Sequence, residues 1–242
     1  MQLPASAPPT FCLPLKTPIF NERVKLIPFD VDLHSAAFVS QTKDRPDLFA
    51  HLPKGPWASL AEWKAMWAEP DFTFSPSNPS SFLFAIIDTT RPPSAEDDEG
   101  EFAGVVAYMN TSQLSRSTEI GFIVVLPAYQ RTHVALNTTG LLLQYAFDDD
   151  TGLALARVGW WTSSKNVASA RLAEKIGFSK VGEIPYHMAF PLGRMNGKVG
   201  NGKPLPPRSD PDDVWRDSLL FSVSWDQWKA GSRKMMEVLM AL

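Results

Sequence analysis

Apolar residues recur along the chain with two periods, one typical of strands and one typical of helices. Polar and apolar residues alternate over 23–29, which indicates a first strand, whereas 32–42 and 59–69 have the spacing of amphipathic helices. The apolar runs 81–88 and 102–109 predict two neighbouring strands. The first part of the chain is therefore expected to form a strand, two helices and a strand hairpin.

The second part of the chain predicts strands and helices in alternation. The expected elements are a strand at 117–125, a helix at 136–150, a buried strand at 157–162, a helix at 166–176, a strand that begins at Phe178 and a final strand at 218–225. The apolar side of the helix at 166–176 is expected to consist of Val167, Ala170, Leu172, Ala173 and Ile176. Gly177 stands where a left-handed residue ends a helix, and Asp226 is placed to cap the last helix.

Length and composition predict one main hydrophobic core. The chain has 242 residues, of which 44% are hydrophobic. We expect a single domain at 19–242, preceded by a Pro-rich arm at 1–18. Residues 89–101, rich in Pro and acidic groups, and residues 191–213, rich in Gly, Pro and Asn, predict long loops.

Charge and apolar content limit the classes of partner. A net charge of -3 gives no basic field for nucleic acid, and no apolar run approaches the length of a membrane span. The opening residues lack the basic start and apolar core of a secretory leader, and the lone Cys12 excludes an intrachain disulfide. We expect a cytosolic protein, with a nuclear location as the alternative, that binds neither nucleic acid nor membrane. The pattern leaves the oligomeric state open.

The connection between the strand at 117–125 and the next helix carries the clearest chemical signal. Pro127 breaks the strand, and a short basic turn at 130–135 leads into the helix. Successive N–H groups in such a turn can converge on a phosphate, and Arg131 could add a charge-assisted contact. The glycine patterns of P-loop nucleotide hydrolases and dinucleotide dehydrogenases do not occur in the chain. Taken alone, the turn is also compatible with a plain strand-to-helix connection.

Two segments together resemble the motifs of a known family. The turn 130–135 resembles motif A of the GNAT acyltransferase superfamily, in which Gln/Arg-x-x-Gly-x-Gly/Ala holds the pyrophosphate of acetyl-CoA. Gln130 and Ala135 match this motif, and His133 takes the first Gly position. Residues 166–178 resemble motif B of the branch that contains the ribosomal-protein N-terminal acetyltransferases, with its Asn-x-x-Ser and its closing Gly-Phe.

The resemblance covers most of the chain and implies a fold. Residues 23–29 look like the family's first strand, and 217–228 look like its last strand and terminal helix. One branch of the superfamily reads Gln-Arg-Thr-basic-small-Ala at the pyrophosphate turn, and 130–135 is similar to this variant. The resemblance implies an α/β (α+β) fold with a mixed, mostly antiparallel central sheet of about seven strands. This sheet would be splayed between its fourth and fifth strands and flanked by helices.

The resemblance also implies acetyl-CoA as the acyl donor. The edge of the fourth strand would pair with the pantetheine arm, and the turn would hold the pyrophosphate. The implied cofactor-binding residues are Ile123, Val124, Val125, Gln130, Arg131, Thr132, His133, Val134, Ala135, Asn166, Ser169 and Arg171. Asn166 is in addition a helix cap, and Arg171, which could meet the 3′-phosphate of CoA, is otherwise an exposed helical residue. No metal is implied.

In the family a neutral amine attacks the thioester directly, which sets three tasks for the site. Glu119 is the first candidate for the base that accepts the amine proton, and a solvated strand carboxylate is the alternative. The backbone N–H of Val124 or Val125 would hold the oxyanion. Ser169 is the candidate hydrogen-bond or proton donor to the leaving thiolate, unless its hydroxyl bonds back to a helical carbonyl.

Two departures from the family pattern bear on the activity. Gly159 stands where many relatives carry a Glu on the fifth strand, and Ala173 stands where many carry a Tyr. His187 and Tyr186 would line the acceptor pocket, although a lone His in a strand is more often structural. We expect an N-acetyltransferase that moves an acetyl group from acetyl-CoA to a primary amine of a small molecule or a protein N-terminus. The alternatives are a CoA-binding protein without turnover and a protein-interaction module that uses the Pro-rich arm.

Overall fold

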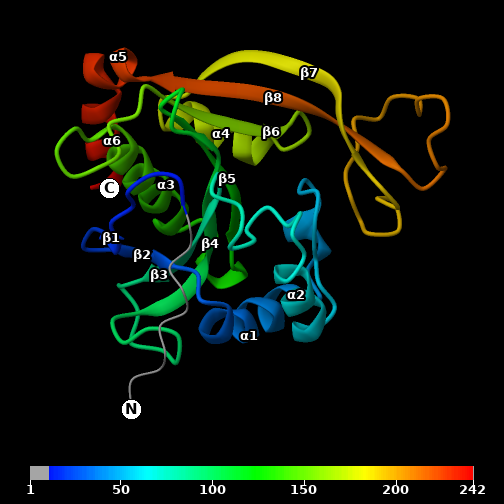
Figure 1. Ribbon diagram of the computed structural model, residues 1–242, viewed down its shortest axis with the longest axis horizontal. Helices are drawn as coiled ribbons and strands as arrows, with labels where there is room; N and C mark the ends of the chain where they lie inside the picture. The colour runs from blue at the N-terminus through cyan, green and yellow to red at the C-terminus, as the bar shows by residue number, and fades with distance from the viewer. Residues whose placement is uncertain (1–10, 242) are drawn as a thin grey trace.

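The computed structural model describes residues 11–241 and arranges eight strands in one open sheet (Figure 1). The strand order is β1–β2–β3–β4–β5–β6–β8–β7, and every neighbouring pair is antiparallel except β5 and β6. The strands are β1 (Ile19–Phe20), β2 (Val24–Pro28), β3 (Phe82–Asp88), β4 (Glu101–Ser112), β5 (Ser117–Val125), β6 (Arg157–Ser163), β7 (Ser179–Phe190) and β8 (Val214–Ser224). The expected mixed, mostly antiparallel sheet is therefore confirmed, with the two-residue β1 as an addition to the seven strands that the sequence predicts.

Helices cover both faces of the sheet. They are α1 (Val31–Thr42), α2 (Leu60–Trp67), α3 (Val134–Phe147), α4 (Val167–Lys175), α5 (Trp225–Gln227) and α6 (Arg233–Met240), with short helical turns at Pro46–Phe49, Pro127–Tyr129 and Trp228–Ser232. On one face, Phe102 of β4 packs against His34 of α1. On the other face, the Tyr108 hydroxyl of β4 donates to the Leu142 carbonyl of α3. The sheet thus separates an α1–α2 side from an α3–α4 side.

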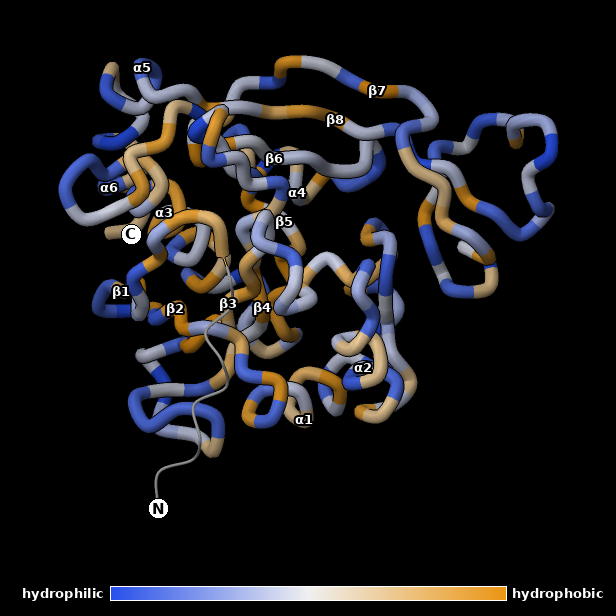
Figure 2. The backbone as a smooth tube through the Cα atoms, viewed as in Figure 1, coloured by the Kyte–Doolittle hydropathy of each residue, from blue (hydrophilic) through white to orange (hydrophobic). Residues whose placement is uncertain are grey.

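The hydrophobic core lies on both sides of the central strands. In Figure 2 the tube is largely orange along β3 and β4. Residues 102–108 of β4 are almost fully buried. On the α1–α2 side, Trp63 is fully buried and its indole N–H donates to the Ser35 hydroxyl at 2.8 Å. Buried aromatic rings contribute a large share of the stabilising apolar area, and this contact satisfies the one polar group of Trp63. The contact therefore ties α2 to α1.

Three local predictions change in detail, and a fourth is confirmed. Val167 is 53% exposed, because it is the first residue of α4 and lies beyond the part of the helix that packs on the sheet. Asp226 does not cap the last helical segment; Ser224 does, through a capping box with Gln227. The final strand begins four residues earlier than predicted, at Val214, since its pairing with β7 continues that far. Gly177 has a φ of +96°, as expected for a helix stop.

The N-terminal segment and the loops are placed as follows. Residues 1–10 of the predicted arm lie outside the described residues, and the part from residue 11 packs onto the sheet through the ring of Phe11 on Tyr108 and Phe82. The predicted loops at 89–101 and 191–213 connect β3 to β4 and β7 to β8. Within residues 11–241, no helix has the length and apolar character that a membrane span requires.

Candidate active site

The β5 and β6 strands separate shortly after they begin. They pair only through residues 117–119 of β5 and 157–159 of β6, and the last pair is Glu119 with Gly159. Beyond it, β5 stays with β4, and a bulge places Phe122 and Ile123 opposite Val106 alone. Phe122 has a φ of +47° at this bulge. In the described part of the chain, the β6-facing edge of β5 from residue 120 onward therefore has no strand partner.

Glu119 lies at the point where the two strands diverge. Its side chain is 9% exposed, and the Asn110 amide donates to Oε2 at 2.8 Å. Burial raises the pKa of Glu119, while the Asn110 hydrogen bond and the charge of Arg216 act in the opposite direction. A Cβ atom at Gly121 would lie 3.2 Å from Glu119 Oε1, so glycine at this position leaves room for the carboxylate. Glu119 is thus a buried carboxylate and not a solvated one.

The turn after β5 is held by its own side chains. The Gln130 amide donates to the Val125 carbonyl at 3.1 Å, which ties the turn to the end of β5. The Thr132 hydroxyl donates to the Tyr129 carbonyl at 2.6 Å and accepts from the Val134 N–H at 3.3 Å. These three contacts fix the path of the backbone into α3.

Several backbone donors of the turn are free. Arg131, with a φ of +62° and an exposed side chain, takes the one left-handed position of the turn. The N–H groups of Arg131, Thr132, His133, Ala135 and Leu136 have no acceptor within the described residues. A row of free N–H groups at a helix N-terminus is a binding site for an anion.

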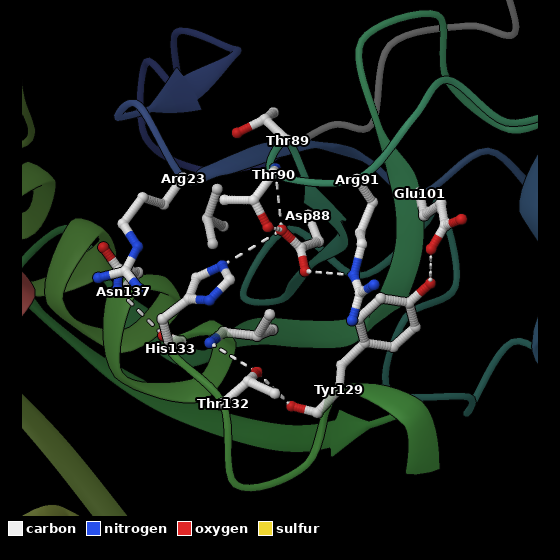
Figure 3. Close-up of polar contacts among 12 residues, drawn as sticks. Arg23, Asp88, Thr89, Thr90, Arg91, Glu101, Tyr129, Thr132, His133 and Asn137 are labelled. Atoms are coloured by element: carbon white, nitrogen blue, oxygen red, sulfur yellow. Dashed lines mark hydrogen bonds and ion pairs between the residues drawn. The ribbon is translucent and has the colours of Figure 1, made fainter.

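The side chain of His133 points away from this row of donors. Its Nε2 atom lies 3.2 Å from Oδ1 of Asp88, a carboxylate at the end of β3 that is only 2% exposed (Figure 3). The Thr90 hydroxyl donates to the same oxygen at 2.6 Å, and the Arg91 guanidinium lies 4.0 Å from the other one. The backbone of His133 is right-handed helical, with a φ of −65°. A side chain at the first Gly position of the motif therefore causes no backbone strain.

The predicted residues of α4 make structural contacts on the other face of the sheet. Asn166 caps the helix, with its side-chain oxygen accepting from the Ser169 N–H at 3.1 Å. The Ser169 hydroxyl does not bond back to a helical carbonyl; it accepts from the Trp160 indole of β6 at 3.0 Å. Ala173 is fully buried, so the position where many relatives carry a Tyr contributes to the core. Arg171 is exposed and has no ion pair in the part of the chain that the structure describes.

Glu119 and Ser169 lie on opposite faces of the sheet. Side chains alternate along a strand, so Glu119, its partner Gly159 and Trp161 share one face, whereas Trp160 and the Ser169 hydroxyl that it contacts lie on the other. Glu119 is therefore on the α1–α2 side of the sheet, at the last paired position of β5 and β6, and Ser169 is on the α3–α4 side.

His187 and Tyr186 separate in space although they are neighbours in sequence. His187 Nδ1 lies 2.8 Å from the Ser218 hydroxyl, and its ring packs on Trp161 on the Glu119 face. Burial and the charge of Arg216 lower the pKa of His187. Tyr186 turns to the β7–β8 loop, where its hydroxyl donates to the Pro204 carbonyl at 2.9 Å. Of the two predicted acceptor residues, only His187 lies on the face of Glu119.

Residues 23–179 match the sequence profile of a family described as acetyltransferase (GNAT) domain, and this range is more than half of the chain. The chain belongs to the GNAT acetyltransferase family. Members of this family use acetyl-CoA as the acyl donor. The chain is also 31% identical over 91 residues to an uncharacterized N-acetyltransferase, YoaA, of Bacillus subtilis strain 168. That alignment covers 38% of this chain and 49% of the relative, so the match spans about half the length of YoaA.

Solved GNAT structures share the fold. A GCN5-related N-acetyltransferase from Brucella melitensis is similar with a TM-score of 0.71 and 24% identity, over 94% of this chain and 86% of that one. RimJ of Mycobacterium smegmatis, in complex with CoA-disulfide, is similar with a TM-score of 0.63 and 18% identity, over 89% of this chain and 88% of that one. Spermidine N-acetyltransferase of Vibrio cholerae, in complex with CoA and spermine, is similar with a TM-score of 0.61 and 14% identity, over 86% of this chain and 99% of that one. The expected GNAT fold is confirmed, with β5 and β6 as the splayed fourth and fifth strands of the family.

Sequence reasoning missed four residues that surround this GNAT site. They are Asn110, Trp161, Arg216 and Ser218. Arg216 had a signal in the sequence, because a charged residue inside the apolar β8 is unusual for a strand that packs in a sheet. The other three had none, since their roles depend on contacts across strands.

Proposed function

We propose that this chain is an acetyl-CoA-dependent N-acetyltransferase that passes the acetyl group directly to a primary amine. The observation that carries the proposal is the position of Glu119, a buried carboxylate with a raised pKa at the point where β5 and β6 diverge. The free N–H groups of the turn begin at the far end of the same strand. The motif at 166–178 and the turn variant at 130–135 support the further proposal that the chain belongs to the RimJ-like branch of the family.

The residues present fit the donor. The pyrophosphate of CoA would accept from the free N–H groups between Arg131 and Leu136, with Arg131 supplying a positive charge. The amides of the pantetheine arm would pair with the unpartnered edge of β5 at 123–125, as an added strand does. Asn166 would contact the same arm, and Arg171 the 3′-phosphate. His133 and Thr132 act through the backbone, because their side chains hold the turn in shape.

The acceptor amine must lose a proton before it attacks the thioester. For an amine with a pKa near 10.4, the neutral form costs roughly 4 to 5 kcal/mol at pH 7, and for an α-amine near 8 about 1 to 1.5 kcal/mol. Glu119 takes that proton, directly or through a water molecule, and its raised pKa brings it closer to that of the amine. Many relatives carry a second carboxylate on the fifth strand, but this chain has Gly159 at that position, so Glu119 acts alone.

The other two tasks fall to the backbone and to Ser169. The amine nitrogen forms a bond to the acyl carbon, and the oxyanion that develops is held by the N–H of Val124 or Val125. When the oxyanion collapses, the carbon–sulfur bond breaks and the CoA thiolate leaves. The Ser169 hydroxyl, which accepts from Trp160, still has its own proton to donate to that thiolate.

Thiol release from acetyl-CoA, measured with a broad panel of amines, tests the function. We expect turnover with at least one amine, a loss of kcat of roughly 100-fold or more in Glu119→Gln, and an unchanged dissociation constant for CoA. Glu183→Gln, which removes an exposed carboxylate of β7, is the matched control and should behave as wild type. Full activity in Glu119→Gln would refute the assignment of the base.

A CoA-binding protein with little or no turnover is the second candidate. Two observations favour it, namely the absence of a carboxylate at Gly159 and the complete burial of Ala173 where many relatives carry a Tyr. Calorimetric binding of CoA together with no thiol release from any amine would establish this candidate. Absence of any thermal stabilisation by millimolar CoA would instead point to a protein-interaction module.

A further inference from the structure

Arg216 of β8 is a buried cation without an ion pair. Its side chain belongs to a residue that is 7% exposed, and no carboxylate of residues 11–241 lies within 4.0 Å of it. Its Nε–H donates to the Ser218 hydroxyl at 2.8 Å and its Nη1 to the His51 carbonyl at 3.3 Å. Both acceptors are neutral, and Nη2 has no partner within the described residues.

A guanidinium in this position is costly unless an anion joins it. Burial removes water from the charge, and neutral acceptors compensate only in part. Burial lowers the pKa of Arg216, although the negative charge of Glu119 acts to raise it. Arginine nonetheless stays protonated in proteins, and Glu119, which lies beyond ion-pair distance, compensates this positive charge only in part. Positive charge with free N–H donors is suited to a ligand oxyanion.

Arg216 lies on the same face of the sheet as Glu119, which is the face that the acceptor amine would approach. Ser218 pairs with Ser163 of β6, two residues on from Trp161, and alternation puts Arg216, Ser218, Trp161 and Glu119 on the same side. His187 joins this group through Ser218 and Trp161. The segment between α1 and α2 closes it, since His51 accepts from Arg216 through its carbonyl.

The ring of His51 offers a second unused polar atom. Its Nδ1 is buried and has no hydrogen-bond partner in the part of the chain that the structure describes. Burial and the charge of Arg216 lower the pKa of His51, which keeps the ring neutral near pH 7. Buried polar atoms without partners are rare in folded proteins and mark places where a ligand or a water molecule completes the contact.

We propose that Arg216 binds an anionic group of the acceptor, so that the substrate is an amine which also bears a carboxylate or a phosphate. This inference rests on the proposed acetyltransferase function and names the class of its acceptor. The guanidinium would take two oxygens through Nη2 and the free hydrogen of Nη1, while the amine of the same molecule faces Glu119. Polyamines would be poor acceptors, because they would bring further positive charge to a buried cation.

Matched pairs of amines test the acceptor class. We would compare β-alanine with β-alaninamide and 2-aminoethyl phosphate with ethanolamine, with spermidine as the polycation. In wild type we expect the better anionic member to have a KM lower than that of its neutral partner by about 10-fold to 100-fold. The two pairs distinguish a carboxylate from a phosphate as the recognised group.

Substitutions at Arg216 show whether this residue is the cause. Arg216→Gln should bring the KM of the anionic member to within about 3-fold of the KM of the neutral one, and Arg216→Lys should retain part of the preference. Differences in amine pKa within a pair cancel, because the same ratio is compared between variants. Arg208→Gln, at an exposed position of the β7–β8 loop, is the control and should match wild type.

Product binding separates this inference from the proposed function. N-acetyl-β-alanine, its amide and N-acetyl-2-aminoethyl phosphate are titrated calorimetrically into CoA-loaded protein, which requires no turnover. Tighter binding of an anionic product in wild type, and its loss in Arg216→Gln, support the inference even if no amine releases thiol. Equal affinities for anionic and neutral products in wild type, or an anion preference that survives in Arg216→Gln, would overturn it. Thiol release with anion-independent KM values would leave the proposed function standing and refute this inference alone.

Discussion

Replacing His133 by glycine would bring the turn closer to the family motif, yet we expect the change to destabilise the protein. His133 has a right-handed helical backbone, so glycine gains nothing from its tolerance of positive φ and adds conformational freedom to the unfolded chain, at a cost of about 0.5 to 1 kcal/mol. The substitution also removes the 3.2 Å contact with Asp88, which is 2% exposed. A buried acceptor that loses a partner costs about 1 to 3 kcal/mol.

The two contributions together predict a loss of about 1.5 to 4 kcal/mol in the free energy of unfolding, measured by urea denaturation. Ala135→Gly, in the first turn of the same helix, measures the backbone contribution alone, at about 1 kcal/mol. A double-mutant cycle with His133→Ala and Asp88→Ala should give a coupling energy of about 1 to 2 kcal/mol. CoA affinity should fall as well, because the free N–H groups lose their fixed arrangement.

Two results would refute this reasoning. One is a His133→Gly variant that is as stable as wild type or more so, which would mean that the glycine of the motif is the better residue here. The other is a coupling energy between His133 and Asp88 within about 0.3 kcal/mol of zero, which would mean that the contact contributes nothing measurable.

Three further predictions concern the site. Burial raises the folded pKa of Glu119 above its ordinary 4.5, so kcat/KM should fall as the pH drops through the raised value. The folded state also binds this proton more tightly than the unfolded state does, so the free energy of unfolding should decline as the pH rises from 4.5 to the raised value. Glu119→Gln should remove this pH dependence of stability. Arg131→Ala should weaken CoA binding by about 1 to 3 kcal/mol by calorimetry, and an unaltered dissociation constant would mean that the side chain meets no phosphate. Ser169→Ala should lower kcat by roughly 10-fold and shift the pH profile of kcat. A loss of stability with no change in kcat would instead mean that Ser169 serves only as the hydrogen-bond partner of Trp160.

The local elements could be read from the sequence because their causes are local. The strand at 117–125 has the predicted bounds, since its β-branched run ends at Pro127, and the helix after Asn166 begins where its cap predicts. The family and the fold also followed from residues close together in sequence, namely the turn 130–135 and the segment 166–178. These patterns needed no knowledge of distant contacts.

Tertiary structure decided the features that depend on residues far apart in sequence. His133 meets Asp88, 45 positions earlier, and this contact explains why the turn tolerates a side chain at a glycine position. Glu119 is buried because β5 remains between β4 and β6 up to that residue, which the strand pattern alone could not show. Arg216 is an unpaired cation only because no carboxylate of the described residues comes within ion-pair distance. The sequence by itself thus determined the elements, the motifs and the family, whereas burial and pairing, which arise from packing across the sheet, determined the chemistry available to each side chain.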